Sequence, residues 1–171
     1  ISAEHFSSRV RDAERLRQFR DRLSACFEEI KVACYVRNQA DMALSSYSTD
    51  VVHGARHSFD PASISADDPY LNHLSMLQLW DSVFGRSALI VREYDRNRLL
   101  QGDICRDFSQ EILRIDPGRL AYVADTNASL GAVFLELLRQ INQSLPTLKE
   151  NAAGWRAAQG IRATLIANLR I

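Results

Sequence analysis

The chain has 171 residues, of which 46% are hydrophobic and 25% charged, a composition typical of a globular protein rather than a disordered one. Lys and Arg together number 21 and balance the 21 Asp and Glu residues, so net charge provides no reason to expect nucleic acid or an anionic membrane as the main partner. The sequence contains no apolar run near the roughly 20 residues that a membrane-spanning helix needs, and we expect one domain over residues 1–171.

The cysteines predict a reducing compartment. Cys26, Cys34 and Cys105 are odd in number and form no CxxC pair, which argues against a disulfide framework and against a zinc site. His53, His57 and His73 are spaced too irregularly for a metal set. With no recognisable signal peptide, the expected location is the cytoplasm, and no metal is expected.

The first part of the chain reads as helix, strand and helix. Apolar residues at helical spacing predict a helix over 8–27, and its Arg residues alternate with acidic ones, which favours a solvated, salt-bridged face over a polyanion-binding surface. The short apolar run 31–36 predicts a buried strand. Asn38 can cap a second helix that runs to about residue 54, followed by a loop over 55–68.

The remaining elements continue this alternation. A helix over 69–84, a strand over 87–92 and helices over 104–115, 128–141 and 148–169 are predicted. Apolar strands alternating with helices indicate an α/β fold with a parallel sheet flanked by helices. Because two strands cannot cover so many helices, we expect further strands before Ile1.

The segment around Arg37 contains residues that could bind a phosphate group. Arg37 follows the predicted strand 31–36, at the end where open α/β sheets bind ligands, and its planar guanidinium can grip two phosphate oxygens. Ser45 lies about two turns into the next helix, so both side chains can converge on one phosphate group. The alternative is an Arg37–Asp41 ion pair with Ser45 on a helix surface.

The segment from Val36 to Tyr47 resembles the 3′-phosphate motif of PAPS-dependent sulfotransferases, in which a strand-end Arg is followed, eight residues later, by a Ser. The matching residues are Arg37, Asn38, Asp41, Ser45 and Tyr47. Gln39 replaces the Pro of many members, as in bacterial polysaccharide sulfotransferases. The resemblance implies a P-loop sulfotransferase-like three-layer fold, PAPS as co-substrate held by Arg37 and Ser45, and a carbohydrate-like acceptor.

The same resemblance points to a catalytic base near the start of the chain. Residues 1–6 occupy the place where cytosolic members carry a catalytic His and carbohydrate-directed members a Glu nearby, which implies His5 or Glu4 as the base. A His that titrates near neutrality suits the removal of a hydroxyl proton. The alternative is an exposed residue pair at a helix entry.

The resemblance does not extend to the loop that binds the 5′-phosphosulfate in sulfotransferases. No Gly-rich or Lys-bearing loop precedes Arg37, so the chain matches the C-terminal two-thirds of the expected domain. Sulfotransferase activity then requires that the full protein carry this loop upstream of Ile1, and its absence there would favour a binding module. Two alternatives stay open: a non-catalytic sulfotransferase-like binding module in polysaccharide assembly, and another P-loop transferase such as a nucleotide kinase.

Overall fold

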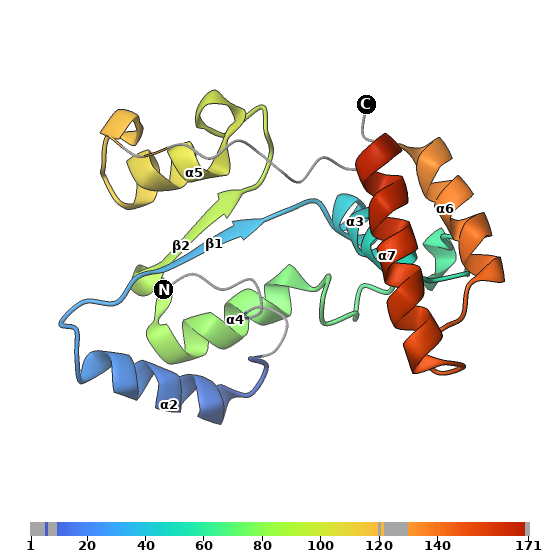
Figure 1. The fold of residues 1–171 in the computed structure, drawn as a ribbon. Coiled ribbons are helices and arrows are strands. Elements are labelled where there is room, and N and C mark those ends of the chain that lie inside the picture. The colour runs from blue at the N-terminus through green and yellow to red at the C-terminus, as the bar shows by residue number, and fades with distance from the viewer. Residues whose placement is uncertain (1–5, 7–9, 120, 122–129, 170–171) are drawn as a thin grey trace. The chain divides into compact units, whose positions relative to one another are not determined.

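The computed structural model describes residues 6, 10–119, 121 and 130–169 (Figure 1). The chain divides into two compact units, unit 1 from residues 1–39 and 65–122 and unit 2 from residues 40–64 and 123–171. Compact units can belong to one domain, so the single domain over 1–171 stays a prediction.

The helices and strands follow the predicted order. Those of unit 1 are α2 (Ala13–Ser24), β1 (Val32–Val36), α4 (His73–Phe84), β2 (Leu89–Glu93) and α5 (Ile104–Asp107), the last continued by a π-helical turn at Phe108–Ile112. Those of unit 2 are α3 (Gln39–Val52, whose first residue falls in unit 1), α6 (Ala132–Ser144) and α7 (Ala152–Leu169). The predicted loop 55–68 contains a single 3₁₀ turn, Pro61–Ser63.

The sheet of unit 1 is parallel, as predicted. β1 and β2 pair in register from Val32 opposite Leu89 to Val36 opposite Glu93, and within the described residues the sheet has these two strands. Figure 1 shows α2 and α4 on one side of the strands and α5 on the other. The chain is therefore a helix-rich α/β protein, while the three-layer sulfotransferase arrangement stays a prediction.

The core of unit 1 forms between α2, α4 and the strands. Leu16 and Trp80 are buried there, and Phe6 packs against the Trp80 ring with 6.2 Å between ring centroids. Trp80 is therefore a core residue of unit 1. The predicted helix 8–27 was too long at both ends: the Asp12 carboxylate accepts hydrogen bonds from two backbone N–H groups and caps α2, and Phe27, beyond the end of the helix, is 59% exposed.

The polar face of α2 is salt-bridged, as predicted. Arg17 pairs with Glu14 at 3.1 Å and Arg20 with Asp21 at 2.7 Å, all on exposed side chains. Exposed pairs of this kind contribute little to stability, so the face is a solvated surface.

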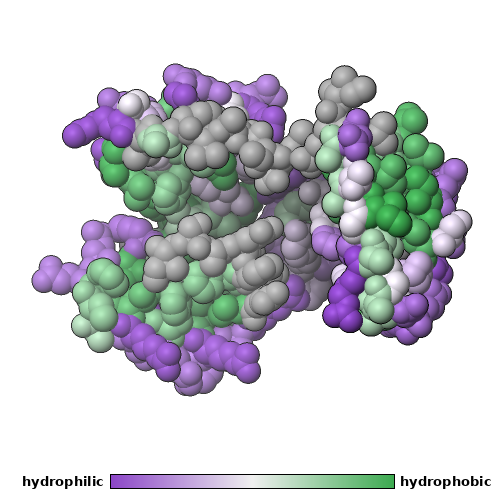
Figure 2. Space-filling model, viewed as in Figure 1, coloured by the Kyte–Doolittle hydropathy of each residue, from purple (hydrophilic) through white to green (hydrophobic). Residues whose placement is uncertain are grey.

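Unit 2 buries polar side chains in its core and exposes apolar ones. Asn142 on α6 and Arg162 on α7 are fully buried beside Val51 and Leu138. By contrast Val133 on α6 is 87% exposed, and Figure 2 shows hydrophobic surface over α6 and α7. Among the described helices, none is both long enough and apolar enough to cross a membrane.

Candidate functional site

Arg37 stands at the carboxyl end of β1, held through its backbone on both sides. The N–H of Tyr94 donates to the carbonyl of Val36 at 2.7 Å, and the carbonyl of Arg37 lies 2.8 Å from Nε2 of His73, which must be the donor. The guanidinium lies over the Tyr94 ring, 5.7 Å from its centroid, a cation–π geometry. The residue is half-buried and its direction is fixed by these contacts.

The Arg37 guanidinium has no counter-charge among the residues of unit 1 that the structure describes. Among the described residues of unit 1, Arg92 is paired with Asp107 at 2.8 Å and Arg98 with Glu93, but no carboxylate lies within ion-pair distance of Arg37. A half-buried guanidinium that rests on an aromatic face keeps its N–H groups available to an anion.

Ser45, the predicted partner of Arg37, lies on the exposed side of α3 and belongs to unit 2. Its carbonyl accepts a hydrogen bond from Oγ1 of Thr49 at 3.0 Å. Asn38 directly precedes the first residue of α3, which is the position predicted for a cap. Arg37 and Ser45 therefore fall in different units.

The other predicted side chains are distributed over the chain. Glu4 and His5, the predicted bases, lie outside the described residues. Tyr47 packs in unit 2 against His57 and donates from its hydroxyl to the His57 carbonyl at 3.2 Å. Cys26, Cys34 and Cys105 are free thiols, and burial raises the pKa of Cys34.

A buried carboxylate that the sequence reasoning missed holds the carboxyl ends of both strands. Asp107 is 1% exposed and accepts four hydrogen bonds: from the Tyr35 hydroxyl at 2.7 Å, from Arg92 Nε and Nη2 at 2.8 and 2.9 Å, and from the Leu100 N–H at 3.1 Å. Burial opposes ionisation of Asp107, but these hydrogen bonds outweigh it and hold its pKa below the usual 3.8. The signal in the sequence is the presence of Tyr35 and Arg92 within largely apolar strands.

Asp107 and the two side chains that donate to it, Tyr35 and Arg92, form a cluster beside the candidate site. Tyr35 on β1 lies opposite Arg92 on β2 in the sheet register, and Arg37 follows Tyr35 by two residues in the chain. Asp107 therefore fixes α5 and both strands at the edge from which Arg37 emerges.

Comparison with known proteins adds one relative. An uncharacterized protein of Archaeoglobus fulgidus is 30% identical over 115 residues, which make up 67% of this chain and 31% of the relative. The matched part thus spans about a third of the relative's length. No family model matches the chain. No solved structure matches it either.

Proposed function

We propose that this chain binds the 3′-phosphate of PAPS and takes part in transferring its sulfuryl group to a hydroxyl or amine of a carbohydrate-like acceptor. The observation that carries the proposal is the environment of Arg37. Its half-buried guanidinium lies on Tyr94 at the carboxyl end of a parallel strand, and no carboxylate among the described residues of its unit pairs with it. The spacing from Arg37 to Ser45 supports it, because that spacing matches the sulfotransferase motif.

The proposed chemistry requires few protein groups. The acceptor oxygen or nitrogen forms a bond to sulfur while the bond from sulfur to the 5′-phosphate oxygen breaks, which releases adenosine 3′,5′-bisphosphate. As in phosphoryl transfer, the protein positions the donor and neutralises its charge. Arg37 and Ser45 would hold the 3′-phosphate, His5 or Glu4 would take the acceptor proton, and no metal is required.

The nucleotide site is tested by comparing two ligands that differ in the 3′-phosphate. Calorimetry on the full-length protein should show tighter binding of adenosine 3′,5′-bisphosphate than of adenosine 5′-monophosphate. Arg37→Ala should remove this preference and weaken bisphosphate binding by about 1.5–3 kcal/mol, the range for a hydrogen bond to a charged group. Arg86→Ala, a change at an exposed position of unit 1, is the matched control. Equal binding of both nucleotides by the wild type would contradict the proposal.

The base is tested by turnover in a sulfate-transfer assay. His5→Ala should lower kcat by about 10²–10⁴-fold while nucleotide affinity stays nearly constant, because a general base acts on the acceptor. If only Glu4→Gln has this effect, the base is the carboxylate. Full activity in both variants would exclude both residues.

A further inference from the structure

Arg162 occupies a position in unit 2 where a charged residue is unusual. The buried face of α7 runs through Trp155, Ala158 and Arg162 at helical spacing, and Arg162 is 1% exposed. Its Nε donates to Oδ1 of Asn142 at 2.8 Å. Asn142 is itself fully engaged, since its Nδ2 donates to the carbonyls of Val51 and Ala55 at 2.8 and 2.9 Å.

The guanidinium of Arg162 is only partly satisfied. Nη1 is buried and has no hydrogen-bond partner among the described residues, and none of their carboxylates forms an ion pair with Arg162. The backbone of Gly54 covers the group so closely that a Cβ there would lie 2.8 Å from Nη2. A buried charge without a counter-ion is costly.

Neighbouring charges increase this cost. Arg56 donates to the carbonyls of Asn142 and Leu145 and pairs with Glu150 at 2.9 Å, so the Glu150 carboxylate is already used. Burial lowers the pKa of Arg162, and the positive charge of Arg56 lowers it further. Among the described residues of unit 2, the buried charge of Arg162 is thus left without a neutralising partner.

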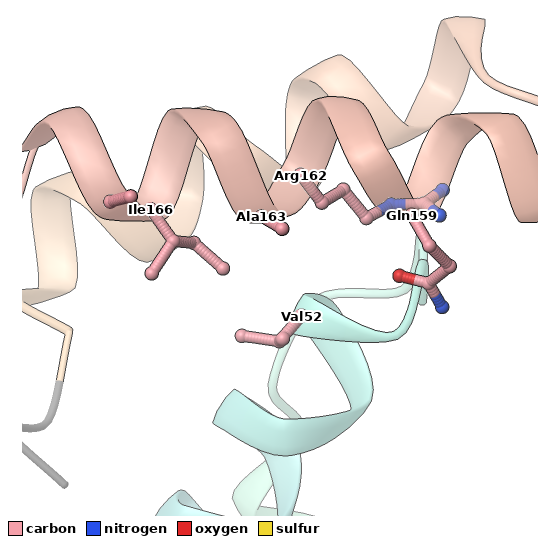
Figure 3. Close-up of a pocket in the computed structure, with 6 residues that line it drawn as sticks. Val52, Gln159, Arg162, Ala163 and Ile166 are labelled. Atoms are coloured by element: carbon pink, nitrogen blue, oxygen red, sulfur yellow. The ribbon is translucent and has the colours of Figure 1, made fainter. Parts of the chain in front are cut away.

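A pocket opens beside this guanidinium. It has a volume of about 340 Å³, lies between the end of α3 and one face of α7, and is lined by Val52, Gln159, Arg162, Ala163, Ile166 and Ala167. Figure 3 shows the Arg162 guanidinium and the Gln159 side chain at one end of the pocket and Ile166 at the other. The pocket is large enough for a small ligand. One end is apolar, and at the other end the Arg162 guanidinium lies buried beneath the surface.

We propose that this pocket binds a small organic oxyanion, whose charged group pairs with Arg162 and whose alkyl part lies along Val52, Ala163 and Ile166. The anion supplies the missing counter-charge, and charge-assisted hydrogen bonds to a guanidinium are the strongest kind available to it. Gln159 makes only a 3.5 Å contact with the carbonyl of His53 and can turn to admit the ligand. This inference is independent of the nucleotide proposal, which concerns Arg37.

Simple probes test the charge and the alkyl requirement separately. Hexanoate, acetate, hexanol and inorganic phosphate are titrated into the full-length protein and followed by NMR chemical shifts and by the rise in Tm that ligand binding produces. Hexanoate should bind at least ten times more tightly than the other three, since only hexanoate offers both an oxyanion and an alkyl chain. Equal binding of hexanoate and hexanol, or of hexanoate and inorganic phosphate, would overturn the proposal.

Paired variants locate the site. Arg162→Met should weaken hexanoate binding about 10- to 100-fold, the loss expected for a charge-assisted hydrogen bond, with Arg156→Met on an exposed turn of α7 as control. Ala163→Phe fills the pocket without touching the bond between Arg162 and Asn142, so it tests the site even if Arg162→Met alters folding. Ala157→Phe, exposed and outside the lining, is its control. Undiminished binding in Ala163→Phe would overturn the proposal.

Discussion

Replacing Asp107 by Asn removes the buried charge that ties α5 to both strands while keeping the shape of the side chain. In the wild type its two carboxylate oxygens accept hydrogen bonds from Tyr35, from two nitrogens of Arg92 and from the Leu100 N–H. An Asn has one acceptor oxygen, and its NH₂ group would face a donor. Breaking a buried ion pair costs about 3–5 kcal/mol; since the Arg92 side chain is 32% exposed, we expect a loss of about 2–4 kcal/mol in the free energy of unfolding.

Urea unfolding at pH 7, followed by circular dichroism, measures this loss as a lower midpoint at unchanged m-value. Glu111→Gln is the matched control because Glu111 faces the same Arg92 from 3.8 Å and its side chain is 35% exposed. Its removal should cost less than about 1 kcal/mol. If Asp107→Asn costs no more than Glu111→Gln, the four hydrogen bonds of Asp107 do not stabilise the edge of the sheet and the reasoning is refuted.

The pH dependence gives a second test of the same cluster. The pKa of Asp107 lies below 3.8 in the folded protein, so its stabilisation is present above about pH 4 and is lost as pH falls through the folded pKa. The Asp107→Asn variant has no such titration. The difference in stability between wild type and variant should therefore shrink in acid, and a constant difference down to pH 2 would contradict it.

Two further changes probe unit 2. Gly54→Ala should destabilise the protein by about 1–3 kcal/mol in thermal unfolding, because Gly54 has φ of +106° and the new Cβ would meet a guanidinium nitrogen at 2.8 Å, whereas Gly160→Ala in open space on α7 should stabilise slightly. The Thr147 N–H and Arg56 hold the pKa of Glu150 at about 2. In Arg56→Met an NMR titration should find a pKa of Glu150 raised toward 4.5 without reaching it, since the Thr147 bond remains.

Much of the secondary structure could be predicted because its signals are local. The apolar run 31–36 and the Gly at position 85, which has φ of +81° beyond α4, mark elements by properties of adjacent residues. The errors are also local. The prediction placed Asp12 inside a helix that it caps. It also expected a continuous helix over 104–115, whereas α5 ends at Asp107 and is followed by a π-helical turn. Periodicity does not distinguish a cap from a helical residue.

In the candidate site, too, only the features set by adjacent residues could be predicted from the sequence. That Arg37 follows a strand could be predicted, because strand and motif are adjacent in the sequence. The partners of Asp107 and Arg162 could not, because they come from residues far away along the chain: Tyr35 for one, Asn142 for the other. Helical spacing places Arg162 on the buried face of α7, but it does not say which side chain lies opposite.

The two buried charges differ in how completely they are satisfied, and this difference predicts opposite responses to neutralisation. Asp107 has a counter-ion and four hydrogen bonds, whereas Arg162 has a single hydrogen bond among the described residues, through Nε, and no counter-ion. Removing a satisfied charge leaves its donors unpaired, while removing an unsatisfied one relieves a desolvation cost. In the same urea titration without added anion, Arg162→Met should therefore lose less stability than Asp107→Asn, because only the acceptor Oδ1 of Asn142 is left unpaired. An equal or greater loss would mean that the Arg162 charge is already neutralised within the folded chain, and the reason for expecting an anion beside it would disappear.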